Sequence, residues 1–433
     1  MKRLALLLLL GACTERVLAP GVCPDFCPGG TIGIKDTILT DVIQRDSAFR
    51  GYVQAWQAEA MPVADIPSVV DSRAIFLMSA MLTRVVPKAG DTTTVPITVD
   101  SARLRVIVVR RDTSSVNLRL KLYHLPITID STSTFAQLDP YFGAPVVDSV
   151  NVSALLARPP IGDTATLRIW GDTIRTDSAG HTLQIVRSDS SLLVYFDLDT
   201  TQAPFVVADA GKLAYGVRAA ADARASAALG TTEVFARAPL IRWFYHYTIP
   251  DTVTATPDSV VQTSGQRETS FDSFVFDPPA PPLDNNLAVG SVPSARSLMR
   301  VAMPAFLHDS IDVVRATVIL VPVAPVQGAP GDSFSVIARP VLTDIGAKSP
   351  LSSATSFYGR TTIHIGSADT VRIELSDLVR AWALDTSATT TFVLGQVPEA
   401  ASYTEIRFYS SRTPAFRPAL HVTYIKRFPF GSP

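Results

Sequence analysis

The chain lacks a surplus of either charge and, beyond its first residues, lacks a long apolar run. Its 38 Lys and Arg residues balance 39 Asp and Glu residues, which leaves a formal net charge of -1 over 433 residues. A nucleic-acid-binding protein would carry a clear basic excess. No apolar run after Leu10 approaches the roughly 20 residues that a membrane-spanning helix needs. We therefore expect no nucleic-acid partner and no helix across a membrane.

A catalytic constellation is also missing from the sequence. None of the six histidines has the His-x-x-x-His or His-Glu-x-x-His spacing of a metal site. Neither a Gly-x-Ser-x-Gly elbow nor a phosphate-binding glycine loop occurs. We therefore expect a protein that is not an enzyme and needs no cofactor.

Aspartate is the one chemically versatile residue that is abundant. Most aspartates stand beside Ser or Thr in turn-like stretches, where an Asp side chain bonds to the nearby backbone. Two denser clusters, Pro282–Asn286 and Gly171–Gly180, supply oxygen ligands suited to a structural calcium. The turn role accounts for both clusters, and we predict no metal site. A polysaccharide-degrading enzyme, which needs two carboxylates about 5 to 10 Å apart, is a less favoured alternative.

All three cysteines lie within the first 27 residues. The chain opens with two basic residues, an apolar run from Leu4 to Leu10 and the small residues Gly11 and Ala12, which is the pattern of a secretory signal. The run is too short to span a bilayer. Residues 10–13, LGAC, resemble the lipobox of bacterial lipoproteins. This resemblance implies cleavage before Cys13 and attachment of lipid to its thiol.

The lipobox resemblance also implies a location in the cell. A lipid on the thiol of Cys13 plus an N-acyl chain exceeds the two signals that stable membrane anchoring needs. The next residue is Thr14, whereas an Asp there usually retains such lipoproteins in the inner membrane. The resemblance therefore implies a protein of the bacterial outer membrane or cell surface, held by its lipid. An ordinary cleaved signal that leaves Cys13 as a free thiol is the alternative.

The other two cysteines, Cys23 and Cys27, are close together in the sequence CPDFC. An even number of cysteines in an oxidising compartment is typical of disulfides. Pro24 and Asp25 are turn formers, which lets the two Cα atoms approach within about 7 Å. A metal site would need further ligands, and neither a second Cys pair nor a His lies nearby. We predict a small disulfide loop.

Alternation of apolar and polar residues dominates the rest of the chain. In residues 117–125, NLRLKLYHL, the leucines at 118, 120 and 122 alternate with Arg119 and Lys121. Comparable runs cover residues 101–109, 191–199, 361–367, 370–377 and 419–425. Turn-forming Asp, Gly and Pro separate them, so the pattern predicts antiparallel strands and an all-β fold. Helical periodicity is found at residues 375–384, and the alanine-rich residues 210–229 suit a short helix or a loop.

The first part of the chain also resembles the second part in sequence. Residues 47–53, 72–78, 99–106, 193–205 and 238–245 match residues 269–275, 295–301, 313–320, 370–382 and 417–424 in the same order. The offset between Phe49 and Phe271 is 222 residues, and it falls to 177 in the fourth match. An insertion in the first copy, about Arg158–Thr182, accounts for the change and suits a hairpin or a long loop. Ordered matches favour two homologous domains over chance similarity between strands.

These features predict the boundaries of the domains. We expect a lipoprotein signal peptide at residues 1–12 and a tether with the disulfide loop at 13–45. A first β-sandwich follows at 46–248, and a polar, proline-containing linker at 249–269. A second sandwich occupies 270–427, and a short tail occupies 428–433.

The second copy carries a family resemblance. It has an Asn-x-Leu-x-Val-Gly passage at Asn285–Gly290, the stretch Phe392–Gly395, and an Arg-Pro pair at Arg417 before a final alternating strand. In these features it resembles the secreted bacterial domains named for a DNRLRE motif, although the hexapeptide itself is absent. Those domains are jelly-roll β-sandwiches similar to carbohydrate-binding modules. The resemblance therefore implies two tandem jelly-roll sandwiches and a carbohydrate ligand.

The richest aromatic stretch is IRWFYHY, residues 241–247. In a strand its odd-numbered residues lie on one face, and Arg242, Phe244 and His246 lie on the other. The repeat aligns the odd-numbered residues with inward positions, so the second set faces outward. An exposed Phe244 between Arg242 and His246 is our candidate site for a sugar or a partner. A single exposed aromatic side chain of no special role is the alternative.

The sequence therefore predicts a non-catalytic surface lipoprotein that binds a polysaccharide or another glycan. A structural or adhesive envelope protein with protein partners is the alternative. A glycan binder should present a concave aromatic face with a few polar groups, whereas a scaffold should present a large protein contact patch.

Overall fold

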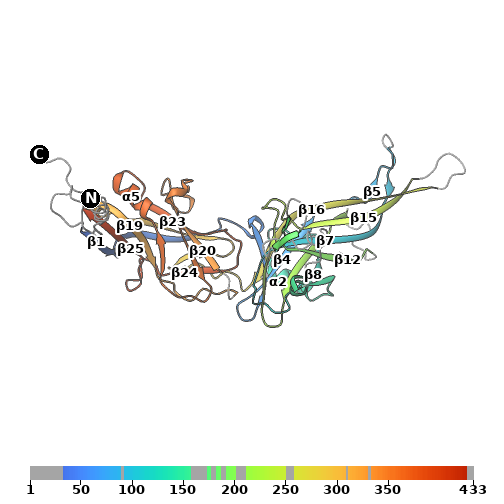
Figure 1. The fold of residues 1–433 in the computed structure, drawn as a ribbon, viewed down its shortest axis with the longest axis horizontal. Helices are drawn as coiled ribbons and strands as arrows, with labels where there is room; N and C mark the ends of the chain where they lie inside the picture. The colour runs from blue at the N-terminus through green and yellow to red at the C-terminus, as the bar shows by residue number, and fades with distance from the viewer. Residues whose placement is uncertain are drawn as a thin grey trace, which may run out of the picture.

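The computed structural model of this chain describes residues 33–88, 92–157, 173–176, 182–186, 192–200, 211–249, 258–308, 311–329 and 333–426. Strands make up 51% of it and helices 10%. The strands form two β-sandwiches that lie end to end along the long axis of the molecule (Figure 1). The predicted all-β sandwich class is confirmed. None of the helices in the described ranges is long and apolar enough to span a membrane.

The first sandwich contains strands β3 (Ala60–Ile66), β4 (Val70–Met78), β7 (Thr98–Arg111), β8 (Arg119–Leu125), β9 (Asp148–Asn151), β12 (Leu192–Leu198), β13 (Ala214–Ala220), β14 (Ala225–Gly230), β15 (Leu240–Ile249) and β16 (Ser259–Asp277). The sheet runs β16-β15-β7-β14-β3-β4-β13-β8-β9, and β12 also pairs with β7. Strand β16 pairs with β15 and, further along, with β4, so the sheet folds back on itself. Phe76, Phe196, Tyr215 and Trp243 fill the enclosed core.

Short elements complete the first half of the chain. They are η1 (Ala55–Gln57), β5 (Arg84–Val85), β6 (Val95–Pro96), α2 (Phe135–Phe142), α3 (Val152–Ala157), β10 (Thr173–Thr176) and β11 (Thr182–Val186). Strands β10 and β11 pair in antiparallel fashion. Strand β10 lies within the predicted insertion, and β11 begins at its last residue.

The second sandwich contains β1 (Ile34–Leu39), β2 (Ile43–Arg50), β17 (Leu287–Gly290), β18 (Ala295–Val301), β19 (Ile311–Leu320), β20 (Ser333–Pro340), β21 (Gly359–His364), β22 (Val371–Glu374), β23 (Thr391–Gln396), β24 (Glu405–Phe408) and β25 (Ala419–Lys426). One sheet runs β1-β25-β19-β22 and the other β21-β20-β23-β18-β17-β24, with β2 on β18. The predicted helix is α5 (Ser376–Leu384), whose Trp382 packs against Phe392 in the core. Three 3-10 turns are η4 (Ala305–Leu307), η5 (Gly346–Lys348) and η6 (Thr355–Phe357).

The two sandwiches share their strand pairing, which supports the internal repeat. Leu104 lies opposite Ile241 in the first sandwich, and Val318 lies opposite Leu420 in the second, as the sequence alignment requires. Strands β4, β7, β12, β13 and β15 thus correspond to β18, β19, β22, β23 and β25. The match of residues 47–53 with 269–275 is wrong by four residues, as the buried Asp46 and Asp272 described below show. Shifting a sequence alignment by an even number of residues keeps inward positions aligned with inward positions. The alternation of apolar and polar residues therefore does not reveal the error.

The predicted linker and tether overlap regular strands. Residues 259–269, assigned to the linker, form much of β16, and residues 250–257 lie outside the described ranges. Residues 34–39 and 43–50, assigned to the tether and the start of the first domain, form β1 and β2 in the second sandwich. These segments are polar because many of their side chains face solvent. A polar composition therefore does not distinguish them from a linker.

The short helix or loop predicted for residues 210–229 is also wrong. That stretch forms the strands β13 and β14, most of whose residues are buried. Gly216 of β13 must be small because helix α2 packs closely on the sheet, and a Cβ atom there would lie 2.4 Å from the Phe142 ring. Burial in a sheet thus overrides the helix propensity of alanine.

Candidate functional site

The predicted site residues lie on the outer face of β15. Ile241, Trp243 and Tyr245 point into the core, as the alternation predicts. Arg242 and Phe244 point to solvent, and the Phe244 side chain is 47% exposed. The sequence therefore placed these two side chains on the correct face.

Neighbouring strands extend this outer face. Strand pairing places Asp197 of β12, Arg103 of β7, Arg242 of β15 and Gln266 of β16 in one row across four strands. A second row places Tyr195 of β12 beside Arg105 and Leu240. We call the outward residues Arg103, Arg105, Leu193, Tyr195, Asp197, Leu240, Arg242, Phe244 and Gln266 the platform.

The platform is hollowed. Its residues, with Val150 and Leu155, line a depression of about 490 Å³. Tyr195, which is 37% exposed, and Phe244 are the two aromatic side chains of this lining. A second depression of about 490 Å³ adjoins the other side of Phe244, against Gln262 and Ser264. Phe244 therefore contributes to both depressions, which suits a ligand longer than one of them.

The charges of the platform are unbalanced. Arg103 Nε lies 2.7 Å from Asp197 Oδ1, so these two groups neutralise each other. The Arg242 guanidinium lies over the Phe244 ring, 5.3 Å from its centroid. Among the described residues, neither Arg105 nor Arg242 has a carboxylate partner, and the buried Nε of Arg105 donates no hydrogen bond. Two guanidinium groups with no acidic partner among the residues that the structure describes therefore face the depression.

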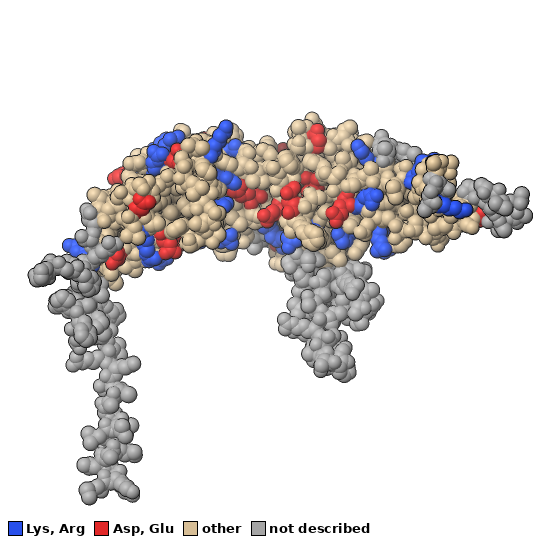
Figure 2. Space-filling model, turned by 90° about the horizontal axis from the view of Figure 1, so that it is seen from above, with Lys and Arg blue, Asp and Glu red and all other residues tan. Residues whose placement is uncertain are grey.

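The chain as a whole has almost no net charge. Figure 2 shows basic and acidic side chains interspersed over one face of the molecule, with no large area of one sign. The formal net charge of the whole chain is -1. Attraction of an anionic ligand would therefore depend on short-range contacts with the platform rather than on the field of the protein.

The third predicted site residue, His246, has another role. Its Nδ1 lies 2.7 Å from Asp100 Oδ1 of the adjacent strand β7. It does not line the depression beside Tyr195. The pairing with Asp100 makes His246 a contact between strands, so it is not part of the platform.

Sequence reasoning missed most of the platform. Alternation in residues 192–198 places Tyr195 and Asp197 outward, and the structure has them there. The signal was therefore present, but alternation does not say which strands are neighbours. Only the pairing of β12, β7, β15 and β16 brings these side chains to Phe244.

The second sandwich provides an internal comparison. Its β25 and β22 correspond to β15 and β12, which places Thr423 at the position of Phe244 and Arg372 at that of Tyr195. The equivalent face thus has no aromatic side chain at either position. The platform belongs to the first sandwich alone of the two.

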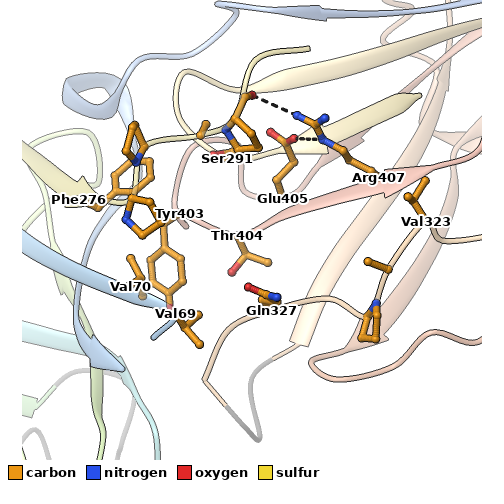
Figure 3. Close-up of a pocket in the computed structure, with 16 residues that line it drawn as sticks. Val69, Val70, Phe276, Ser291, Val323, Gln327, Tyr403, Thr404, Glu405 and Arg407 are labelled. Atoms are coloured by element: carbon orange, nitrogen blue, oxygen red, sulfur yellow. Dashed lines mark hydrogen bonds and ion pairs between the residues drawn. The ribbon is translucent and has the colours of Figure 1, made fainter. Parts of the chain in front are cut away.

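A further cavity, of about 270 Å³, lies between the sandwiches (Figure 3). Phe276, Tyr403 and the prolines of residues 278–281 line it. The Glu405 carboxylate at its rim is held by Arg50 at 2.6 Å and by Arg407 at 2.8 Å. These three charged groups, all from the second sandwich, neutralise one another, so this cavity has fewer groups available to a ligand than the platform has.

The remaining predicted sites differ in what the structure says of them. Cys13, Cys23 and Cys27 lie outside the described residues, as does most of the cluster Gly171–Gly180. In the other aspartate cluster, the Asp284 carboxylate accepts hydrogen bonds from the Asn286 backbone and from Arg407, both at 2.8 Å. Burial alone would raise the pKa of Asp284, but these bonds hold it below its usual value.

The described residues offer few groups for metal binding or acid–base catalysis. They contain no group of three or more His, Cys, Asp or Glu side chains that could hold a metal ion. Asp197 is the one carboxylate among the described residues that line the platform depression. The platform thus lacks the carboxylate pair that a glycosidase needs.

Comparison with known proteins identifies no family for this chain. No protein-family model matches it, and no curated protein matches its sequence. The resemblance to DNRLRE-type domains therefore stays a prediction.

Proposed function

We propose that the protein binds a polysaccharide that carries carboxylate or sulfate groups, and that it does so on the platform of the first sandwich. The observation that carries the proposal is that two exposed rings, Tyr195 and Phe244, lie around one depression together with two guanidinium groups. These belong to Arg105 and Arg242, which have no acidic partner among the described residues. Ligand sites typically combine apolar and aromatic walls with a few placed polar groups.

The chemistry of the platform fits such a polymer. The apolar faces of sugar rings pack on aromatic side chains, and the open depression admits a chain that continues past its ends. Guanidinium groups bind carboxylate and sulfate groups through paired hydrogen bonds. Gln266 and the Arg103–Asp197 pair add hydrogen-bonding groups for hydroxyls at the side of the depression.

The position of the platform supports the proposed role of a surface lipoprotein anchored through Cys13. Ile34 near the start of the described chain pairs with Ile425 near its end, in the second sandwich. Figure 1 shows β1 and β25 at one end of the molecule and β7, β12 and β15 in the other half. An anchor before residue 33 would thus hold the second sandwich near the membrane and present the platform farther away.

Affinity electrophoresis tests the proposal. The protein is run through gels that contain a polyuronate, a sulfated polysaccharide or a neutral glucan, together with the variants Phe244→Ala and Tyr195→Ala. We expect retardation by an acidic polymer and at least about a fivefold loss of affinity in each variant, since truncating an anchor side chain costs more than about 1 kcal/mol.

The second sandwich supplies the matched control. Thr423→Ala changes the position equivalent to Phe244 and should leave retardation unchanged. Retardation by the neutral glucan alone would contradict the proposed binding of acidic groups by Arg105 and Arg242. Retardation by no polymer would contradict the proposed function, and equal losses in Phe244→Ala and Thr423→Ala would place binding elsewhere.

A further inference from the structure

The two sandwiches are closed by segments from different parts of the chain. In the first, β16 follows β15 along the chain, pairs with it and then pairs with β4. In the second, β25 and β18 correspond to β15 and β4, and their partners are β1 and β2. We call residues 34–50, which contain β1 and β2, the closing segment. More than 230 positions separate this segment from β18, the nearer of its two partner strands.

The closing segment binds as a peptide would bind to sheet edges. All six residues of β1, Ile34 to Leu39, pair with β25, and β2 pairs with β18 as far as Arg50. Val42, just before β2, and Ile43, its first residue, are each 7% exposed and pack into the core of the second sandwich. Main-chain pairing plus buried alternate side chains is the way in which proteins accept an added strand.

A buried carboxylate marks the same place in both sandwiches. Asp46 lies opposite Met299, is 3% exposed and accepts the Ser411 backbone N–H at 2.6 Å. Asp272 lies opposite Phe76, is 2% exposed and accepts the Thr232 backbone N–H at 3.0 Å.

The two donors are also equivalent. Ser411 and Thr232 are 179 positions apart, and so are Tyr424 and Tyr245 of the last strands. The closing segment therefore carries the same buried acceptor as β16, although β16 belongs to a continuous stretch of chain.

Side chains beyond the core hold the segment as well. Asp36 of β1 accepts a hydrogen bond from the Thr423 hydroxyl at 2.5 Å, and His421 Nε2 lies 3.3 Å from the same carboxylate. At the other end, Arg50 reaches Glu405 at 2.6 Å. The closing segment is thus held by polar contacts at both ends and by apolar packing between them.

We propose that the second sandwich is a strand acceptor, and that its groove between β25 and β18 takes the closing segment of a second copy of this chain as well as its own. The groove recognises an extended segment with Val42 and Ile43 at its centre and Asp46 as its buried anchor. Within one molecule the covalent link gives the resident segment a high effective concentration, so it occupies the groove in the isolated chain. Exchange between copies requires that the copies be concentrated. This proposal does not depend on the glycan proposal.

The test uses the full chain with a protease recognition sequence inserted between Gly51 and Tyr52. Gly51 is exposed, and a side chain there would meet nothing within 4 Å, so the insertion site is open. After cleavage, a fluorescent synthetic peptide of residues 33–51 is added in excess as the stand-in for a second copy. Fluorescence anisotropy and size-exclusion chromatography then report whether the peptide replaces the resident segment.

We expect the cleaved segment to remain bound and the peptide to replace it with a stoichiometry of one to one. Asp46→Ala in the resident segment should speed the replacement at least tenfold. Asp272→Ala, at the equivalent site of the first sandwich, should leave the rate unchanged, and a peptide of scrambled sequence should not bind. Loss of the cleaved segment with the second sandwich still folded would overturn the proposal. So would failure of the peptide to enter after the resident segment has been removed by mild denaturant.

Discussion

Gly265→Ala distinguishes a strand from a linker in residues 249–269. Gly265 lies in β16 opposite Trp243 of β15. A Cβ atom there would lie 2.5 Å from Cζ2 of the Trp243 ring and 2.8 Å from its Cε2. The Trp243 side chain is fully buried, so the ring has no room to move away. In a linker the same substitution would meet nothing.

The size of the effect follows from two opposing contributions. Forcing one extra carbon into a packed site costs roughly 1 to 3 kcal/mol. Replacing glycine also reduces the freedom of the unfolded chain, which stabilises the protein by about 0.4 to 1 kcal/mol. The steric cost is the larger, so we expect a net loss of about 0.5 to 2 kcal/mol. For a domain of about 200 residues this lowers the melting temperature by a few degrees.

Thermal unfolding followed by tryptophan fluorescence measures this effect. Ser264→Ala is the matched control, because Ser264 is the neighbouring residue in the same strand and is exposed. We expect the control to melt within about a degree of the parent, since exposed substitutions usually change stability by under about 0.5 kcal/mol. If Gly265→Ala melts at or above the temperature of the control, the packing of β16 on Trp243 is refuted.

Three further predictions test other parts of the structure. Burial raises the pKa of Asp272, so the parent should lose stability as pH rises from the unfolded value near 4 through the folded pKa, and Asp272→Asn should remove this slope in urea unfolding at several pH values. Trp382→Ala should cost the second sandwich about 3 to 5 kcal/mol and leave binding to the platform intact, measured by unfolding and affinity electrophoresis together. Asp197→Asn frees the guanidinium of Arg103, so it should raise affinity for an acidic polymer several-fold and change stability by under about 1 kcal/mol because the pair is exposed; lower affinity would contradict this.

Local patterns predict what depends on one strand at a time. The alternation in residues 241–247 correctly places Trp243 inward and Phe244 outward, because side chains alternate in any strand. The two-copy organisation has the same basis, since equivalent strands bury equivalent positions. Leu104 and Val318 align in sequence and hold the same place in the pairing.

What the sequence does not reveal depends on which strands are neighbours. Tyr195 is about 50 positions before Phe244 in the sequence, and only the shared neighbour β7 brings them to one depression. Composition predicts a linker at residues 249–269, because the hydrogen bonds that make residues 259–268 a strand come from β15. Such pairings are fixed by the whole fold rather than by local composition.

The glycan proposal and the strand-acceptor proposal concern equivalent positions in the two sandwiches. Arg242 and Phe244 of the first sandwich correspond to His421 and Thr423 of the second. In the second sandwich both of these side chains contact Asp36 of the closing segment. In the first, β15 is paired with the continuous strand β16, so Arg242 and Phe244 are not needed to hold a segment and are open to a ligand. Closing one sandwich with a distant segment therefore commits these outward positions to that segment, which gives a physical reason for the platform to occur in the first sandwich.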